Sequence, residues 1–338
     1  MTDYFRPLVQ IGPARPDTAL SLAGGWGWFT HAEVLSRSTP PRVVPAADIP
    51  AIVMARLTAP RPAMAGLTLD RPRIMGILNT TPDSFSDGGQ HNAVPDALRV
   101  AQKMVAAGAD ILDIGGESTR PGADFVPVSE EITRTSPVIA ALRGAGMHTP
   151  ISIDTRKAAV AEAAVSAGAN LVNDVSGFTY DPALGPLCQK LALPVCVMHA
   201  QGDPATMHLD PQYDNVLLDV FDALERQISM LEASGIPRGA ILADPGIGFG
   251  KTQDHNLALL ARLSLFHALG TPILLGVSRK RFIGTIGNAP QAQDRAPGSI
   301  AVALAGLGQG VQMIRVHDVD DTRQAVALWH AAYFGSIL

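Results

Sequence analysis

Polar side chains stand where a series of short apolar runs end in this 338-residue sequence. An apolar run needs only a turn residue at its end, and burying an ionised group costs free energy unless it is paired or hydrogen-bonded. The recurrence therefore indicates one site assembled from the ends of successive runs. The residues are Asn79, the segment GGESTRPG at 115–122, Asp154, Asn173, Asp174, His199, Asp244, Ser278, Arg279, Lys280, Arg315 and His317.

Four of these residues suit a flat nitrogenous ring. Asp154 and Asp244 supply carboxylates that only accept hydrogen bonds when ionised. Asn173 supplies an amide that both donates and accepts, and Lys280 supplies an ammonium donor. This mixture matches a heterocycle whose edge carries donors and acceptors, such as a fused pyrimidine.

A second group suits an anion. Arg120, Arg315 and His317 are cationic or hydrogen-bonding side chains, and the glycine-rich turns offer backbone amides. Asn79 can offer a carbonyl oxygen to Mg²⁺. We therefore expect a di- or polyphosphate beside the ring, which implies that the phosphate leaves while another group joins the ring.

The elements that must position these residues alternate between two patterns. Short apolar runs rich in β-branched residues predict strands, and each is followed by a segment with helical spacing of apolar residues, clearest at 217–231. The predicted strands are 74–78, 111–114, 151–154, 171–173, 195–198, 241–243, 273–275 and 313–316.

Eight such units average about 33 residues, which fits a (β/α)8 TIM barrel of roughly 250 residues. We therefore predict an α/β protein, a (β/α)8 TIM barrel over residues 71–338 with its site at the carboxyl ends of the strands. A doubly wound open sheet is the alternative, because strand–helix alternation does not by itself decide closure. Residues 1–70 hold nine of the 26 prolines and little periodicity, so we expect a separate N-terminal extension.

Composition excludes several classes of partner. Hydrophobic residues make up 47% of the chain and the net charge is −5, so no basic field draws the molecule to nucleic acid or an anionic membrane. No stretch reaches the roughly 18 apolar residues that span a bilayer. Cys188 and Cys196 match no metal or redox spacing, and the N-terminus lacks a secretory pattern. We expect a cytoplasmic protein.

Motifs along residues 71–338 resemble those of the dihydropteroate synthase family, whose members are pterin-binding TIM barrels. The motifs are MGILNTTPDSFSDGG (75–89), DIGGESTRPG (113–122), SIDT (152–155), ND (173–174), MH (198–199), ADPGIGFGKT (243–252), GVSRKRFIG (276–284) and IRVHDV (314–319). The resemblance implies a transferase of folate biosynthesis that needs Mg²⁺. It joins 6-hydroxymethyl-7,8-dihydropterin diphosphate to 4-aminobenzoate, giving 7,8-dihydropteroate and diphosphate, and the resemblance also implies a homodimer.

The resemblance assigns a role to each matching position. The pterin would be held by Asp154, Asn173, Asp244 and Lys280, and the diphosphate by Asn79, Thr119, Arg120, Arg315 and His317, with Asn79 also on the metal. The aminobenzoate would meet Phe85, Arg120, Pro121, Lys280 and Arg281. The catalytic set would be Asp154, Asp244, Lys280 and Arg315.

One position departs from the family pattern. Many members carry Ser after the Ser-Arg-Lys run, whereas this chain carries Arg281. An arginine there could pair with the aminobenzoate carboxylate or point to solvent.

Two other functions remain open from the residues. A pterin-dependent methyltransferase of the same superfamily would share the carboxylates and Asn173, but it has no need of the anion-binding groups at 278–280 and 315–317. A catalytically silent pterin-binding regulator would not require Asn79, Lys280, Arg315 and His317 to be intact. For the transferase we expect a dissociative, carbocation-like substitution, because positive charge on the methylene carbon can delocalise into the pterin.

Overall fold

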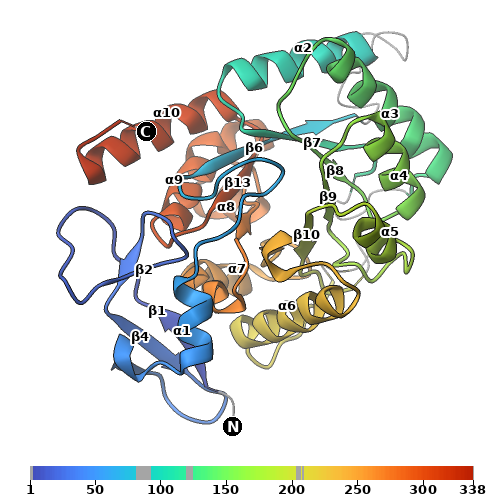
Figure 1. Ribbon diagram of the computed structural model, residues 1–338. Coiled ribbons are helices and arrows are strands. Elements are labelled where there is room, and N and C mark those ends of the chain that lie inside the picture. The colour runs from blue at the N-terminus through green and yellow to red at the C-terminus, as the bar shows by residue number, and fades with distance from the viewer. Residues whose placement is uncertain (1–2, 81–92, 119–124, 203–206, 208, 338) are drawn as a thin grey trace.

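The computed structural model describes residues 3–80, 93–118, 125–202, 207 and 209–337. A sheet of parallel strands organises the larger part of the chain, and helices surround it (Figure 1). The strands pair in the order β11-β10-β9-β8-β7-β6-β13-β12. They are β6 (Arg73–Asn79), β7 (Ile111–Gly115), β8 (Ile151–Asp154), β9 (Leu171–Asp174), β10 (Val195–Met198), β11 (Ile241–Asp244), β12 (Leu274–Leu275) and β13 (Met313–Val316).

The two ends of this strand series also meet. Ala243 in β11 forms a parallel bridge with Ile273, the residue before β12, and its amide donates to the carbonyl oxygen of Pro272 at 2.9 Å. A closed ring of eight parallel strands alternating with helices is a (β/α)8 barrel. The predicted barrel and all eight predicted strands are confirmed, and the open doubly wound sheet is excluded.

Helices cover the outside of the ring. The segment predicted at 217–231 lies in α6 (Val216–Ala233), where Leu217, Val220, Leu224, Ile228 and Leu231 are buried, as a 3.6-residue period requires. Among the described residues, no helix has the length and apolar character needed to cross a membrane. The other helices are α2 (Ala93–Ala106), α3 (Val128–Gly144), α4 (Ala158–Ala167), α5 (Leu184–Lys190), α7 (Gln253–Leu260), α8 (Arg281–Ile286), α9 (Ala296–Leu307) and α10 (Val319–Phe334), with short 3-10 turns η4 (Arg238–Ala240), η5 (Leu263–Leu269) and η6 (Ala292–Arg295).

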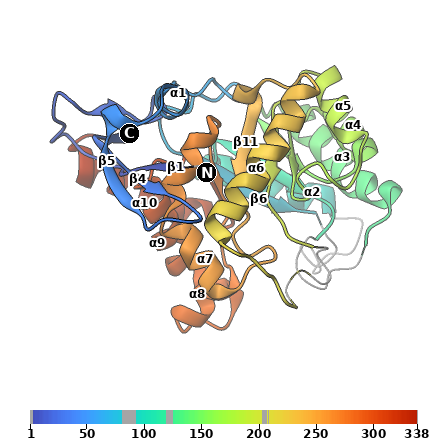
Figure 2. The ribbon, with the colours of Figure 1, turned by 90° about the horizontal axis from the view of Figure 1, so that it is seen from below.

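The N-terminal extension folds on one flank of the barrel (Figure 2). Its core joins Phe5, Phe29, Val34 and Leu57 to Ala268 in η5, so the extension packs against the segment that leads into β12. It contains a β1-β4-β5 antiparallel sheet, a β2-β3 pair and one α-helix. The elements are β1 (Tyr4–Pro7), β2 (Leu20–Ser21), β3 (Trp28–Phe29), β4 (His31–Leu35), β5 (Arg42–Pro45), η1 (Ala46–Asp48) and α1 (Ala51–Thr58).

The segment between the extension and β6 fills the amino-terminal end of the barrel. Met64 and Leu69 are almost fully buried. They share a core cluster with side chains from the early positions of seven barrel strands, Met75, Ile111, Leu171, Cys196, Leu242, Leu274 and Met313. This apolar plug fills one end of the barrel, which leaves the opposite end, where the strands finish, as the place for a ligand site.

Candidate active site

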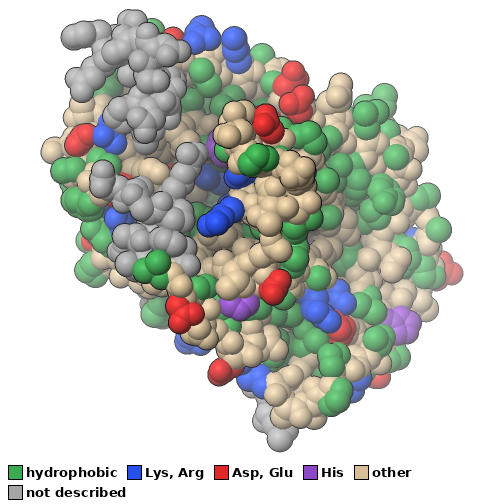
Figure 3. All heavy atoms as spheres, turned by 180° about the vertical axis from the view of Figure 1, so that it is seen from behind, with side chains coloured by type: hydrophobic (Ala, Val, Ile, Leu, Met, Phe, Trp, Pro, Cys, Tyr) green, Lys and Arg blue, Asp and Glu red, His purple; other side chains and the backbone are tan. Residues whose placement is uncertain are grey.

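The residues predicted to hold the pterin lie at the carboxyl ends of β8, β9 and β11 or in the segment that follows β12. Asp154 ends β8 and is paired in register with Asn173 of β9, and Asp244 ends β11 opposite Met198. Lys280 stands immediately before α8. The structure thus brings these residues from separate strands to one end of the barrel. On the face seen from behind, Lys and Arg side chains gather with a histidine at a hollow (Figure 3).

Arg315 crosses the mouth of the barrel from β13. Its Nε donates to Oδ2 of Asp113 at 2.6 Å, and its Nη2 donates to Oδ2 of Asp154 at 2.7 Å. These carboxylates are on β7 and β8, two and three strands away around the ring. The contacts therefore run through the mouth rather than along the sheet, and they join the predicted ring-binding and anion-binding groups into one network.

Asp113 is the functional candidate that the sequence reasoning missed. Its side chain is fully buried, and its Oδ2 also accepts a hydrogen bond from the amide of Asn173 at 3.3 Å. The other oxygen, Oδ1, is buried and has no hydrogen-bond partner among the described residues. The sequence feature that could have identified Asp113 is its position as a charged residue inside the apolar run ILDIG at 111–115.

Two carboxylates share one guanidinium in this network. Burial raises the pKa of Asp154 to about 8 and the Asp113 carboxylate adds to the rise, while Arg315 lowers it. Burial works against the charge on Arg315, but Asp113 and Asp154 outweigh it and raise the pKa of the guanidinium. Ionising Asp154 is therefore costly without a ligand, and a ligand that offers N–H donors or develops positive charge would favour its charged form.

Asp244 and Lys280 influence each other's ionisation. Burial raises the pKa of Asp244, against the opposing charge of Lys280. Burial also lowers the pKa of Lys280 to about 8, and Asp244 opposes that change. The ammonium group donates to the carbonyl oxygen of Ile247 and lies 4.4 Å from the centroid of the Phe249 ring. Lys280 is thus held against the loop that follows β11.

The loop at 245–250 needs glycine at two positions for this arrangement. Gly246 has a φ of +66°, and a Cβ there would lie 1.9 Å from the carbonyl oxygen of His199. Gly248 has a φ of +84°, and a Cβ there would meet the Lys280 side chain at 2.9 Å. Only glycine accommodates both the left-handed backbone and these close approaches. The amide of Gly246 donates to Oδ1 of Asp244 at 2.7 Å, which fixes the carboxylate.

Replacing Lys280 with Met is expected to stabilise the unliganded protein at pH 7. The folded-state pKa of about 8 lies below the ordinary value of 10.5, so the native state holds the charged lysine at a cost that Met removes. Between about pH 8 and pH 10.5 the unfolded chain binds one more proton than the native protein, so wild-type stability rises with pH there. The advantage of Lys280→Met should shrink across that window.

Thermal unfolding at pH 7 and at pH 9.5 measures both parts of this expectation. Lys103→Met, at an exposed position on α2, controls for the loss of a positive charge. A Tm for Lys280→Met below that of the wild type at pH 7 would contradict the burial argument.

Asn79 and His317 lie at the same end of the barrel. Asn79 ends β6 and is half-buried beside Gly115 of β7. His317 follows β13, and its Nδ1 lies 2.9 Å from Oγ of Ser278, which also accepts from the His317 amide. Among the described residues, no three His, Cys, Asp or Glu side chains could hold a metal ion together. The amide oxygen of Asn79 is of the type that Mg²⁺ accepts as a ligand, and its contact with a metal stays a prediction.

Several predicted site residues cannot be placed. Phe85, Thr119, Arg120 and Pro121 lie outside the described residues. Arg281 is the first residue of α8, and its side chain is exposed. Their predicted contacts stay predictions.

Two polar residues that the sequence analysis placed at strand ends, His199 and Asp174, are buried and have their own partners. His199 is buried, and its Nδ1 lies 2.9 Å from Nζ of Lys251. Burial lowers the pKa of His199 to about 3, and the Lys251 charge contributes. The carboxylate of Asp174 accepts from the amides of Ser176 and Phe178. These groups hold loops in place.

Comparison with known proteins identifies the family to which this chain is similar. The model of the family described as "Pterin binding enzyme" matches residues 75–317. The dihydropteroate synthase of Escherichia coli K12 is 45% identical over 256 residues, which cover 76% of this chain and 90% of that protein. Two structures of the Xanthomonas albilineans enzyme are also similar. The one with 4-aminobenzoic acid is 45% identical with a TM-score of 0.74, covering 79% of this chain and 96% of that one. The one with 7,8-dihydropteroate is 42% identical with a TM-score of 0.71, covering 79% and 95%.

Proposed function

Because the chain belongs to the family of pterin-binding enzymes, we propose that the mouth of its barrel is the site of the dihydropteroate synthase reaction. The chain is a transferase of folate biosynthesis that joins a pterin to 4-aminobenzoate to give 7,8-dihydropteroate. The observation that supports the location is the convergence of Asp154, Asn173, Asp244, Lys280 and Arg315 from separate strands.

The buried carboxylates would hold the pyrimidine edge of the pterin. Asp244 and Asp154 are 6% and 8% exposed, and the pKa of each is raised mainly by burial. A ring that offers N–H donors would supply further hydrogen-bond partners, beyond the Gly246 amide for Asp244 and Arg315 for Asp154. Asn173 donates to Asp113, so its amide oxygen is oriented to accept a hydrogen bond.

The same carboxylates would favour the transition state. In the proposed dissociative substitution, the bond between the methylene carbon and the diphosphate oxygen breaks first, and both electrons leave with the diphosphate. Positive charge then spreads into the ring, where Asp154 and Asp244 stabilise it in a low-dielectric site. The amine of 4-aminobenzoate attacks the methylene carbon and afterwards loses one proton.

The leaving diphosphate would lie toward Arg315, His317 and Asn79. The guanidinium of Arg315 has five N–H donors, and the two hydrogen bonds to Asp113 and Asp154 use only two of them. Its side chain is 21% exposed at the mouth, so it can also meet a phosphate oxygen. Magnesium bound with the diphosphate, held through Asn79, would supply charge neutralisation.

We also propose that the chain acts in the cytoplasm as a homodimer, as the family resemblance implies. Cys188 and Cys196 are both buried and free, which suits a reducing compartment. Light scattering of the purified protein would give the mass of the assembly.

Diphosphate release tests the proposed function. We expect continuous release over many turnovers only when the pterin diphosphate, 4-aminobenzoate and Mg²⁺ are all present, together with an equal amount of 7,8-dihydropteroate. Continuous release without the amine would indicate a diphosphatase, and pterin binding without any release would indicate a silent binding protein. A single-turnover experiment examines the order of steps, since diphosphate release that waits for the amine would argue for concerted displacement.

A further inference from the structure

The turn after β12 contains a residue in a strained conformation. The amide of Lys280 donates to the carbonyl oxygen of Val277 at 3.2 Å, which closes a four-residue turn with Ser278 and Arg279 at its centre. Arg279, the third residue of this turn, has a φ of +58°. Glycine or asparagine usually occupies a third turn position with positive φ. A larger side chain persists there only where the surrounding structure holds it, and such residues cluster at active sites.

Contacts with α9 hold the backbone of Arg279. Its amide donates to Oγ of Ser299 at 2.8 Å, and its carbonyl oxygen accepts from Nη1 of Arg295 at 3.0 Å. Ser299 is buried in the first turn of α9, and Arg295 immediately precedes that helix. These contacts explain how the turn tolerates a positive φ. They do not explain why the residue is an arginine, because almost any residue has the same amide and carbonyl groups.

The side chain of Arg279 is bound to Asp318. Its Nε donates to Oδ2 of Asp318 at 3.0 Å and its Nη2 donates to Oδ1, so the two groups meet as a two-point fork. Asp318 is the N-cap residue of α10, yet its side chain makes no capping hydrogen bond to that helix. An N-cap aspartate normally accepts from the first helical amides. The carboxylate of Asp318 therefore joins two turns and does not cap its own helix.

The fork connects the turns that carry Lys280 and His317. The sheet register between β12 and β13 covers two residue pairs, and beyond them side chains connect the two segments. Oγ of Ser278 lies 2.9 Å from Nδ1 of His317 and accepts from its amide. Arg279 binds Asp318 one residue further along each segment. These side-chain contacts set the distance between the turn before Lys280 and the imidazole of His317.

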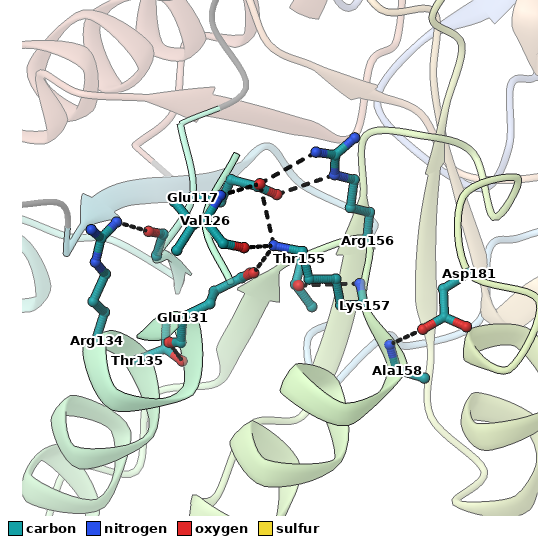
Figure 4. A network of polar contacts seen from close by, with 11 residues as sticks. Glu117, Val126, Glu131, Arg134, Thr135, Thr155, Arg156, Lys157, Ala158 and Asp181 are labelled. Atoms are coloured by element: carbon teal, nitrogen blue, oxygen red, sulfur yellow. Dashed lines mark hydrogen bonds and ion pairs between the residues drawn. The ribbon is translucent and has the colours of Figure 1, made fainter. Parts of the chain in front are cut away.

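Asp318 depends on a single cation for its position. Glu117, by comparison, is bound by Arg156 and also pairs with Lys157, in a buried network between the segments that follow β7 and β8 (Figure 4). Among the described residues, Asp318 forms an ion pair with Arg279 alone. Without the guanidinium, its carboxylate would turn to the first amides of α10, as an N-cap aspartate normally does.

We propose that Arg279 is a positioning residue for the diphosphate of the substrate. It acts through Asp318 on the turn that carries His317, and it touches neither substrate. Lys280 is held separately, because its ammonium group donates to the carbonyl oxygen of Ile247 in the loop after β11. Arg279 therefore aligns the anion-binding side of the site with a ring-binding side that other contacts fix. The inference rests on the proposed function, since the diphosphate contact of His317 comes from it.

Two single variants separate this role from direct binding of an anion by Arg279. Arg279→Asn removes the fork, and asparagine tolerates the left-handed backbone. Asp318→Ala removes the partner and leaves the charge of Arg279 in place. A guanidinium that bound the diphosphate itself would bind it at least as tightly after Asp318→Ala, because a nearby negative charge is gone. A positioning residue that acts through Asp318 predicts weaker binding in both variants.

Arg262→Asn is the matched control. Arg262 binds Glu33 through Nε at 3.2 Å and Nη2 at 3.5 Å, which is also a two-point fork. The side chains of that pair are 39% and 13% exposed, and those of Arg279 and Asp318 are 31% and 15% exposed. The control fork joins the start of η5 to β4 of the N-terminal extension, and neither residue belongs to the predicted site.

Calorimetric titration measures the two sides of the site with separate ligands, inorganic diphosphate with Mg²⁺ and unphosphorylated 6-hydroxymethyl-7,8-dihydropterin. We expect Arg279→Asn and Asp318→Ala each to raise the Kd for diphosphate at least tenfold while the Kd for the pterin changes less than twofold. The double variant should be within twofold of the weaker single variant, because both changes break one contact. Arg262→Asn should change neither Kd more than twofold.

Each other result has a separate meaning. If the wild-type protein forms no 7,8-dihydropteroate, the proposed function fails before any variant is compared. If the wild type is active and Arg279→Asn binds diphosphate as the wild type does, the positioning role is wrong. Weaker binding in Arg279→Asn but not in Asp318→Ala would overturn it in favour of direct binding by the guanidinium. Equal rises in both Kd values would also overturn it, because they would indicate general damage to the barrel mouth.

Discussion

Replacing Arg315 with Met is expected to lower kcat/KM by about a hundredfold to a thousandfold. This is the usual effect of removing one preorganised group that stabilises charge in a transition state. The variant removes the donor proposed to face the leaving diphosphate and also leaves Asp113 and Asp154 without their guanidinium. Breaking a buried ion pair by removing one partner costs about 3–5 kcal/mol of stability, so activity must be measured well below the Tm of the variant.

Arg73→Met separates the two effects. Arg73 is buried and pairs with Asp110 at 2.9 Å at the first residue of β6, at the end of the barrel remote from Arg315. We expect a comparable loss of stability with kcat/KM within about threefold of the wild type. If Arg315→Met retains more than a tenth of the wild-type kcat/KM, the electrostatic role assigned to Arg315 is wrong.

Replacing Asp244 with Ala is expected to weaken pterin binding by about a hundredfold or more. A hydrogen bond to a charged group contributes roughly 1.5–3 kcal/mol, and a factor of ten in affinity corresponds to about 1.4 kcal/mol. The carboxylate is 6% exposed, and the Gly246 amide holds it in place. The variant would therefore leave the ring N–H groups unpaired and remove the counter-charge of Lys280.

Calorimetric titration with the pterin diphosphate measures this loss, and Asp174→Ala is the matched control. Asp174 is also a buried carboxylate at a strand end, but it accepts from Ser176 and Phe178 in the following turn. We expect Asp174→Ala to lower stability and to leave pterin affinity within about threefold. Unchanged binding by Asp244→Ala would remove Asp244 from the pterin site.

The local pattern of the chain was sufficient to predict the barrel elements. Strand and helix periods act over a few residues, so runs such as 151–154 and 217–231 identified β8 and α6. The site at the strand ends could be predicted as well, because parallel strands place their carboxyl ends at one face. On this ground the sequence analysis assigned Asp154, Asn173, Asp244, Lys280 and Arg315 to a single site.

The partner of each charge was decided only by the closed fold. Arg315 bonds to carboxylates 202 and 161 residues away, and no local pattern specifies which strands face each other across a ring. Asp113 was not predicted as a site residue, because the role of an acidic residue inside an apolar strand is recognised only when the cation that it pairs with is known. Periodicity is a property of neighbouring residues, whereas the free energy of a buried charge depends on distant groups that only tertiary packing brings within hydrogen-bond distance.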